Sequence, residues 1–282
     1  MKKLALLSVM LLLGSSAVMA ACEYKCVTPY DMNSKFRSVT AAATGLNFLV
    51  ERKAESIIKK EVLRISQAEK IDVEVQSYSP RDLKSGIFKS LKVEGKNVVM
   101  NDIHVSELSL ATLCDFNYIE DTDEGVVFHE DFPMSFDMMF SQDDLNNTFK
   151  HDRYNLLVSD INATIGKYVK GLSIGTTKVA IKSGKFYYII GFNIPFSSVE
   201  QKIVIQSDLN IKDGNIDLTN TKIVSGNLKI DARKLNYLMK KLNPLEFAVN
   251  IIENKNANVY VRDVEIVNDN VITKGVVVIP KN

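Results

Sequence analysis

The chain has no tryptophan, and its 282 residues include only 6 prolines and 3 cysteines. So few prolines exclude a proline-rich linker. No run of about 18 apolar residues is present, so we expect no transmembrane helix. The formal net charge is +1, which does not indicate a nucleic-acid-binding protein. The composition is that of a globular chain, with 46% hydrophobic and 24% charged residues, which suffices for a sizeable core.

The first 20 residues have the organisation of a secretory signal peptide. Lys2 and Lys3 give a positive start, Leu4–Leu13 is an apolar run, and Val18 and Ala20 occupy the −3 and −1 positions of a signal-peptidase site. The apolar run is too short to span a bilayer stably. We therefore expect an exported bacterial protein that is periplasmic.

Three cysteines in an exported chain leave an odd one to explain. Met19–Cys22 is similar to a bacterial lipobox, so acylation of Cys22 would anchor the chain and leave Cys26 and Cys114 as an even pair. Cleavage after Ala20 would instead give a soluble product, in which Cys22 and Cys26 could close a local ring and Cys114 would be buried and free. Both alternatives stay open on the sequence.

Charge is distributed unevenly along the chain. Residues 97–149 hold 12 acidic residues and no Lys or Arg, whereas the rest of the mature chain holds 33 basic and 22 acidic residues. The basic part could orient the protein against an anionic membrane. The alternative is that two solvated surfaces attract each other across the fold.

Residues 38–68 have the hydrophobic period of a long amphipathic helix. Apolar residues recur close to every 3.6 positions, and charged side chains fill the other face: Arg52, Lys53, Glu55, Lys59, Lys60 and Arg64. About 28 residues at about 1.5 Å each would form a rod of roughly 40 Å. The apolar positions are Val39, Ala42, Leu46, Leu49, Val50, Ile57, Ile58 and Ile65.

After Ile71 the hydrophobic period changes to two, which is typical of strands with one buried face. This pattern favours antiparallel sheets over a doubly wound parallel sheet, whose strands are continuous apolar runs. The predicted fold is α+β, with residues 21–37 as an N-terminal segment and residues 38–282 as one elongated domain. In it, the long helix packs against a strongly curved, mainly antiparallel sheet. Predicted strands include 71–75, 98–104, 105–113, 134–140 and most of the chain after 177, and short helices are predicted at 141–149, 160–172 and 231–242.

One catalytic motif is present by its letters only. Gly171–Gly175 matches G-x-S-x-G, which marks a hydrolase nucleophile when a strand precedes the serine and a helix follows it. Here the order is reversed, and all three histidines precede Ser173. A hydrolase would therefore require Ser173 to meet a base brought close only by folding. Metal, Walker A and dinucleotide motifs are absent, so we predict a protein that is not an enzyme and needs no metal or cofactor.

Three parts of the pattern carry a resemblance to a known family. Phe132–Asn146 is an apolar strand that runs into a capped helix. The second part is the segment 179–191 followed by 202–218, which contains the hairpin Leu-x-Ile-x-Asp-Gly-x-Ile. The third is 235–245, with a Leu-Asn-Pro-Leu helix end, followed by 259–274. In this order, residues 38–280 resemble the LmeA-like family of exported phospholipid-binding proteins. The acid-rich residues 115–131 depart from that pattern.

The resemblance implies a tubular lipid-binding architecture and phospholipid binding, with a role in lipid transport or cell-envelope maintenance. An internal lipid site would need a long apolar trough, in which each buried acyl CH₂ contributes about 0.8 kcal/mol. We expect the helix to form one wall and the sheet the other. The lining residues would be Leu46, Leu49, Val50, Ile57, Ile58, Phe186, Tyr188, Ile190, Phe192, Ile203 and Ile205.

The alternative is that these same residues form a closed core. The protein would then be an envelope interaction or assembly protein without a lipid ligand, acting through its acidic stretch or a sheet edge. A filled core together with an exposed apolar patch would favour this second hypothesis.

Overall fold

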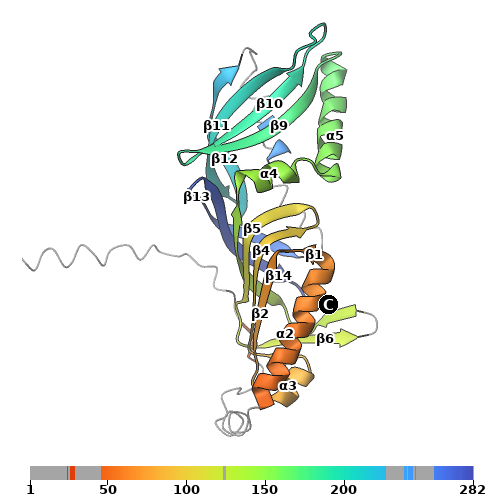
Figure 1. The fold of residues 1–282 in the computed structure, drawn as a ribbon, viewed down its shortest axis with the longest axis vertical. Helices are drawn as coiled ribbons and strands as arrows, with labels where there is room; N and C mark the ends of the chain where they lie inside the picture. Colours follow the sequence, from red (N-terminus) through yellow and green to blue (C-terminus); the bar gives the residue numbers. More distant parts are fainter. Residues whose placement is uncertain are drawn as a thin grey trace, which may run out of the picture.

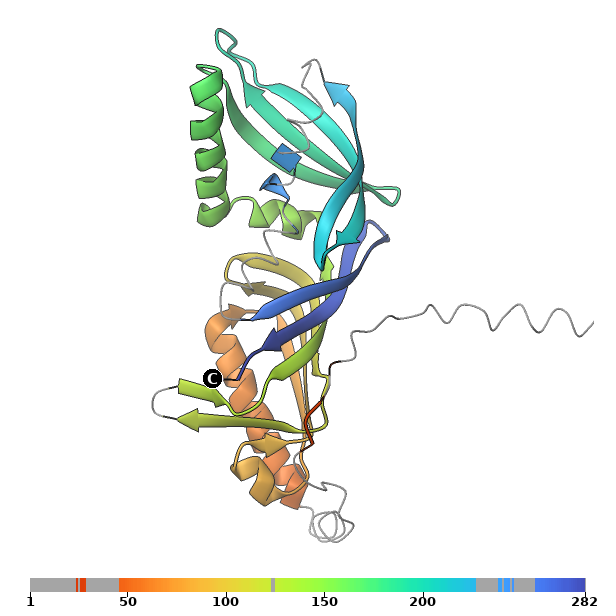
Figure 2. The same ribbon diagram turned by 180° about the vertical axis from the view of Figure 1, so that it is seen from behind.

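The computed structural model describes residues 24, 26–28, 46–122, 125–226, 238–239, 241–243, 245 and 257–281. This part of the chain is an α+β structure with mostly antiparallel sheets, as predicted. Its shape is elongated (Figures 1 and 2). The predicted signal peptide and Cys22 lie outside the described residues.

One half of the molecule is built on a seven-stranded sheet. Helix α2 is followed by four antiparallel strands in sequence order, β2, β4, β5 and β8, and the C-terminal hairpin β13–β14 joins this sheet at β8. The short strand β1 continues the edge that β2 forms on β4. The bounds are α2 (Leu46–Ile65), β1 (Ser66–Gln67), β2 (Lys70–Gln76), β4 (Ser90–Met100), β5 (Ile103–Thr112), β8 (Phe132–Phe140), β13 (Asn258–Val267) and β14 (Asn270–Ile279).

Two insertions extend this half. The first contains α3 (Pro80–Lys84) and β3 (Ile87–Phe88), and the second is the hairpin of β6 (Asn117–Thr122) and β7 (Gly125–Phe128). Together β3, β6 and β7 form a small third sheet. The acid-rich stretch therefore contains a hairpin that the sequence did not predict.

The other half repeats the arrangement of a helix followed by four antiparallel strands. Its sheet has the order β12–β11–β10–β9, and α5 contacts β9 as α2 contacts β2. The buried residues Leu238, Met239, Leu242 and Leu245 are helical. The bounds are α4 (Gln142–Thr148), α5 (Asp152–Tyr168), β9 (Ser173–Lys182), β10 (Lys185–Asn193), β11 (Gln201–Lys212) and β12 (Asn215–Gly226).

A single hydrophobic cluster joins the two halves. It contains Phe136 and Met138 of β8, Val259 of β13, and Phe186 and Ile190 of β10. Each of these is an inward position of an alternating strand, so the period of two determines which side chains meet. The backbone also connects the halves, because the Val261 N–H donates to Gly214 O over 2.8 Å.

The long N-terminal helix is the main correction to the predicted fold. Helix α2 has 20 residues, about 30 Å at about 1.5 Å per residue, because Ser66 and Gln67 pair with β4 as strand β1. Residues 38–45 lie outside the described part. The predicted strand 98–104 was also wrong: Asn101 and Asp102 take positive φ values of 47° and 70° and form the turn between β4 and β5.

The short helices follow their capping signals. Ser141 Oγ accepts from the Asp144 N–H, and Asp144 Oδ2 accepts from the Ser141 N–H over 2.8 Å, so the predicted capping box starts α4. Helix α5 begins eight residues earlier than predicted, because His151 acts as its N-cap. His151 Nδ1 accepts from the Arg153 N–H over 3.3 Å.

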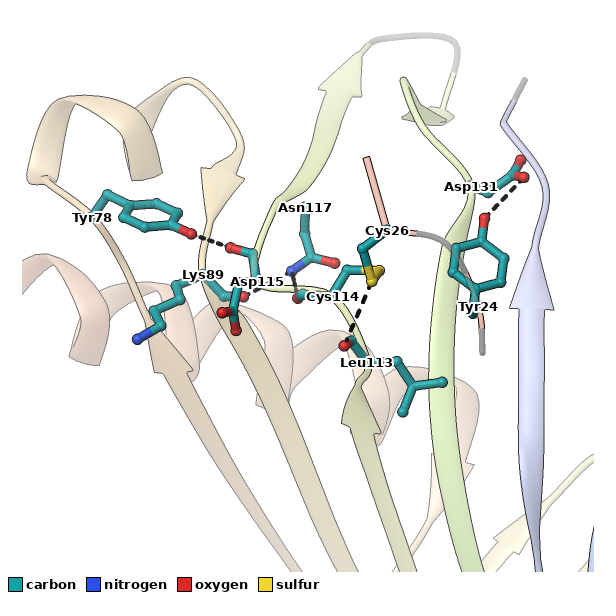
Figure 3. The surroundings of a disulfide bond; sticks show 9 residues. All are labelled: Tyr24, Cys26, Tyr78, Lys89, Leu113, Cys114, Asp115, Asn117 and Asp131. Atoms are coloured by element: carbon teal, nitrogen blue, oxygen red, sulfur yellow. Dashed lines mark hydrogen bonds between the residues drawn. A yellow bond between two sulfur atoms is a disulfide. The ribbon is translucent and has the colours of Figure 1, made fainter. Parts of the chain in front are cut away.

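A disulfide fastens the N-terminal segment to the loop between β5 and β6 (Figure 3). Cys26 and Cys114 are bonded with their Cα atoms 5.5 Å apart. The loop is held by Asn117, whose Nδ2 donates to Lys89 O and to Cys114 O, each over 2.9 Å. This pairing is the one expected if Cys22 is acylated, and it differs from a local ring between Cys22 and Cys26.

We predict that Cys26→Ala will lower the free energy of unfolding by about 4 kcal/mol, because the disulfide closes a loop of 88 residues in the unfolded chain. Urea unfolding of the oxidised protein and the variant measures the difference. A reductant should destabilise the original protein and leave Cys26→Ala unchanged. Equal midpoints for the two oxidised proteins would contradict the prediction.

Candidate functional site

The strand residues predicted to line a trough lie together in the upper half of Figure 1, on β10 and β11. A water molecule inside a cavity would contact its walls, so exposed fractions of 0–2% mean that other atoms surround these side chains. The core around them is filled. The residues are Phe186, Tyr188, Ile190, Phe192, Ile203 and Ile205.

The helix residues predicted for the opposite wall lie in the other half of the molecule. Ile58 packs in a cluster with Val75 and Phe88, and Val50 is half-buried, whereas Leu49 and Ile57 are 64% and 55% exposed. The expectation that these side chains face the β10–β11 set was therefore wrong. The physical reason is that each helix packs against a strand of its own half, α2 against β2 and α5 against β9. Leu46 is the first residue of α2, and the structure does not describe its side chain.

Tyr188 carries a polar group inside this core, with its side chain 1% exposed. Its hydroxyl lies 2.6 Å from the Tyr154 hydroxyl, and each hydroxyl lies 3.2 Å from Leu242 O. Since each hydroxyl has one proton, one tyrosine donates to the other, which in turn donates to Leu242 O. Burial raises the pKa of Tyr154 to about 12 and that of Tyr188 well above its usual value. The pair joins α5, β10 and the helical residue Leu242 through satisfied hydrogen bonds.

These pKa shifts predict that the protein becomes less stable above about pH 10. The unfolded tyrosines ionise near pH 10, while the folded Tyr154 keeps its proton up to about pH 12. The folded state therefore binds more protons in this window, and its stability falls as pH rises. Urea unfolding between about pH 9 and 11 should give a flatter profile for Tyr154→Phe, by up to about 1.4 kcal/mol per pH unit. Identical slopes would contradict the assignment.

Two glutamates of α2 point toward β2, not toward solvent. Among the described strands, β2 pairs with β4 alone, so its other edge would present unpaired backbone N–H groups. Glu55 Oε1 accepts from the Val75 N–H over 3.2 Å. Glu51 Oε1 accepts from the Ser77 N–H and hydroxyl over 2.8 and 2.7 Å. These bonds fix the rotation of α2 about its axis.

With that rotation, α2 presents a surface that is both basic and apolar. Leu49 and Leu63 are 64% and 43% exposed, and Phe48 is also exposed beside Arg52, whose Cζ lies 4.8 Å from the centre of the Phe48 ring. Helical spacing places Lys53 and the other members on the same side. We call this surface the α2 outer face: Leu49, Arg52, Lys53, Ser56, Lys60 and Leu63, all exposed.

The surroundings of the α2 outer face are also basic. Lys59 and Arg64 are exposed next to it. The third glutamate of the helix, Glu61, pairs with Arg64 over 2.7 Å, where both side chains are exposed. The helix thus carries five exposed cations and one exposed carboxylate, since Glu51 and Glu55 are engaged by β2. The sequence indicated the cations, but it placed Leu49 and Ile57 on the buried side.

A groove of about 550 Å³ on the seven-stranded sheet is lined mainly by charged residues. Lys70 pairs with Asp72 over 2.5 Å, which raises the pKa of the lysine and lowers that of the carboxyl. Lys274 lies 3.9 Å from Asp137 and 3.8 Å from Glu265. Such paired charges suit solvent more than acyl chains.

The G-x-S-x-G segment has a structural explanation. Ser173 is the first residue of β9, so a helix precedes it and a strand follows, the reverse of a nucleophile elbow. Its Oγ accepts from Asn193 Nδ2 over 3.3 Å. Gly175 leaves room for the Glu200 carboxylate, which would collide with a Cβ there.

The histidines are engaged elsewhere in the fold. His129 pairs with Glu120 over 2.9 Å and His151 with Asp102 over 2.6 Å. His104 lies at the start of β5, where its N–H donates to Thr148 Oγ1 over 3.4 Å. Within the described residues, no group of three His, Cys, Asp or Glu side chains is arranged to hold a metal ion.

Comparison with known proteins gives no relative. No protein-family model, curated protein or solved structure significantly matches the chain. Among the described helices, none combines the length and apolar character needed to cross a bilayer.

Proposed function

We propose that this protein binds phospholipid at a membrane surface outside the cytoplasm, without catalysis, and that the α2 outer face is its contact. One observation carries the proposal: Leu49 and Leu63 are exposed among Arg52, Lys53 and Lys60 on one side of a helix. A helix that lies in a membrane interface combines these two kinds of residue.

Both kinds of residue would contribute measurably to the free energy of membrane binding. A cation near an anionic membrane surface contributes about 1 kcal/mol. Burial of a leucine side chain contributes about 1.5–3 kcal/mol. Glu51 and Glu55 point toward β2, so these two carboxylates, which anionic lipid would repel, lie away from the α2 outer face.

A surface contact fits this fold better than an internal lipid. The side chains Phe186, Ile190 and Ile203 have an exposed fraction of 0%, so an acyl chain would have to displace packed atoms. The Cys26–Cys114 disulfide supports a location outside the cytoplasm, since disulfides persist in oxidising compartments. The secretory signal predicted in residues 1–20 supports the same location.

The second candidate is an envelope interaction or assembly protein. The filled core favours it, and so does the exposed apolar part of the α2 outer face, which could bind an acidic protein surface. The two candidates differ in one respect: only lipid binding predicts affinity for pure lipid vesicles.

We predict that Lys53→Gln/Lys60→Gln will bind vesicles of mixed phosphatidylglycerol and phosphatidylcholine about 30-fold more weakly than the original protein. Two lost cations correspond to about 2 kcal/mol. Vesicle co-sedimentation at several lipid concentrations measures the affinity. The matched control is Lys182→Gln/Lys212→Gln, which removes the same charge from exposed positions on the other sheet.

Two further measurements separate the alternatives. Binding should weaken with added salt and in pure phosphatidylcholine, because charge attraction is screened or absent. If the original protein fails to bind anionic vesicles, or if both double variants lose affinity equally, the α2 outer face is not a lipid contact.

A further inference from the structure

Two connections meet at the end of the molecule opposite to α3 (Figures 1 and 2). One is residues 194–200 between β10 and β11, and the other is residues 169–172 between α5 and β9. Pro195 packs against Gly171, where an added Cβ would lie 3.0 Å from Pro195 Cγ. We call these two connections the distal tip.

The distal tip exposes a group of apolar side chains. Phe196 is fully exposed, and Val199 and Val169 are 65% and 47% exposed. Single exposed apolar residues are common on protein surfaces, but three on adjoining loops form a patch. None of these three side chains belongs to the hydrophobic cluster that joins the two halves.

The backbone holds Phe196 outward at a conformational cost. The Ser197 N–H donates to Ile194 O over 3.2 Å, so residues 194–197 form a turn with Pro195 in its second position. Phe196 occupies the third position with a φ of +67°. Turns with positive φ there normally use Gly or Asn, because a bulky side chain is strained. Backbone strain of this kind clusters at functional positions, so the conformation of Phe196 marks this turn as a candidate site.

At the distal tip the basic side chains face solvent, whereas the acidic side chain is bonded to the sheet. Lys167, Lys170 and Lys202 are exposed around the apolar patch. The acidic residue Glu200 points back into the sheet, where its Oε1 accepts from the Thr176 N–H over 2.7 Å. Its other oxygen lies 3.9 Å from Lys202 Nζ, which leaves that ammonium group mostly in solvent.

We propose that the distal tip is a second membrane contact, in which Phe196 enters the interface of an anionic bilayer and the three lysines bind lipid phosphates. An aromatic side chain at the apex of a basic loop complements a lipid surface in both polarity and charge. This inference rests on the proposed function for the class of partner, but it uses none of the residues of α2.

The absence of tryptophan makes a direct test available. Phe196→Trp places a unique fluorophore at the apex. The variant is mixed with vesicles of phosphatidylglycerol and phosphatidylcholine, with and without bromine on the acyl chains. In a second arm, a C-terminal hexahistidine tag holds the same variant on vesicles that contain a nickel-chelating lipid, so the tip is tested even if α2 does not bind. We expect emission to shift to shorter wavelength and to be quenched by the brominated chains in both arms.

The matched control is Leu156→Trp, at an exposed apolar position in the first turns of α5, away from the tip. Its emission should stay that of a tryptophan in water. Phe196→Ser should also weaken the affinity of the untagged protein for vesicles about tenfold, as expected for a lost buried aromatic ring, while Leu156→Ser should not.

The outcomes separate the two lipid contacts. Emission of Phe196→Trp that stays water-like in both arms overturns the inference and leaves the α2 proposal standing if the vesicles still bind. Insertion in the tethered arm without binding in the untethered arm supports the tip and contradicts the proposed function. A spectral shift that grows with protein concentration in the absence of lipid would identify a protein contact and overturn the inference.

Discussion

The orientation of α2 depends on carboxylates that cover the edge of β2. Glu51 and Glu55 accept hydrogen bonds from Ser77 and Val75, where the sheet would otherwise present unpaired N–H groups. Because these bonds fix the rotation of the helix, they also determine what faces outward. Lys53 and Lys60 remain in solvent together with Leu49 and Leu63. The same interaction thus protects a sheet edge and produces a surface suited to anionic lipid.

The second constraint is that each helix packs against a strand of its own half. Helices α2 and α5 contact β2 and β9, and the hairpin of β13 and β14 connects the halves. The apolar faces are satisfied by this packing, and Phe186 and Ile203 are wholly enclosed. An acyl chain inside either half would have to displace these packed side chains. The exposed apolar residues on α2 and at the distal tip are therefore the lipid contacts that we propose.

Much of the fold could be predicted because it follows from local periodicity and caps. The alternation of Phe186, Tyr188 and Ile190 predicted a half-buried strand, and Ser141 with Asp144 predicted the start of α4. The site could not be predicted in the same way. Helical spacing alone made Leu49 and Ile57 core candidates, whereas the bonds of Glu51 and Glu55 to a distant strand turn them outward. The sequence did not predict the turn at Phe196, because a turn with positive φ at that position normally contains glycine or asparagine there.

Lysine footprinting on vesicles tests the central claim most directly. The protein is treated with a water-soluble acetylating reagent, free and bound to anionic vesicles, and the modification of each lysine is measured by mass spectrometry. The account predicts that Lys53 and Lys60 react more slowly on the vesicles, whereas Lys182 and Lys212 react as in the free protein. Unchanged reactivity of Lys53 and Lys60 on bound protein, or equal protection of all four, would contradict it.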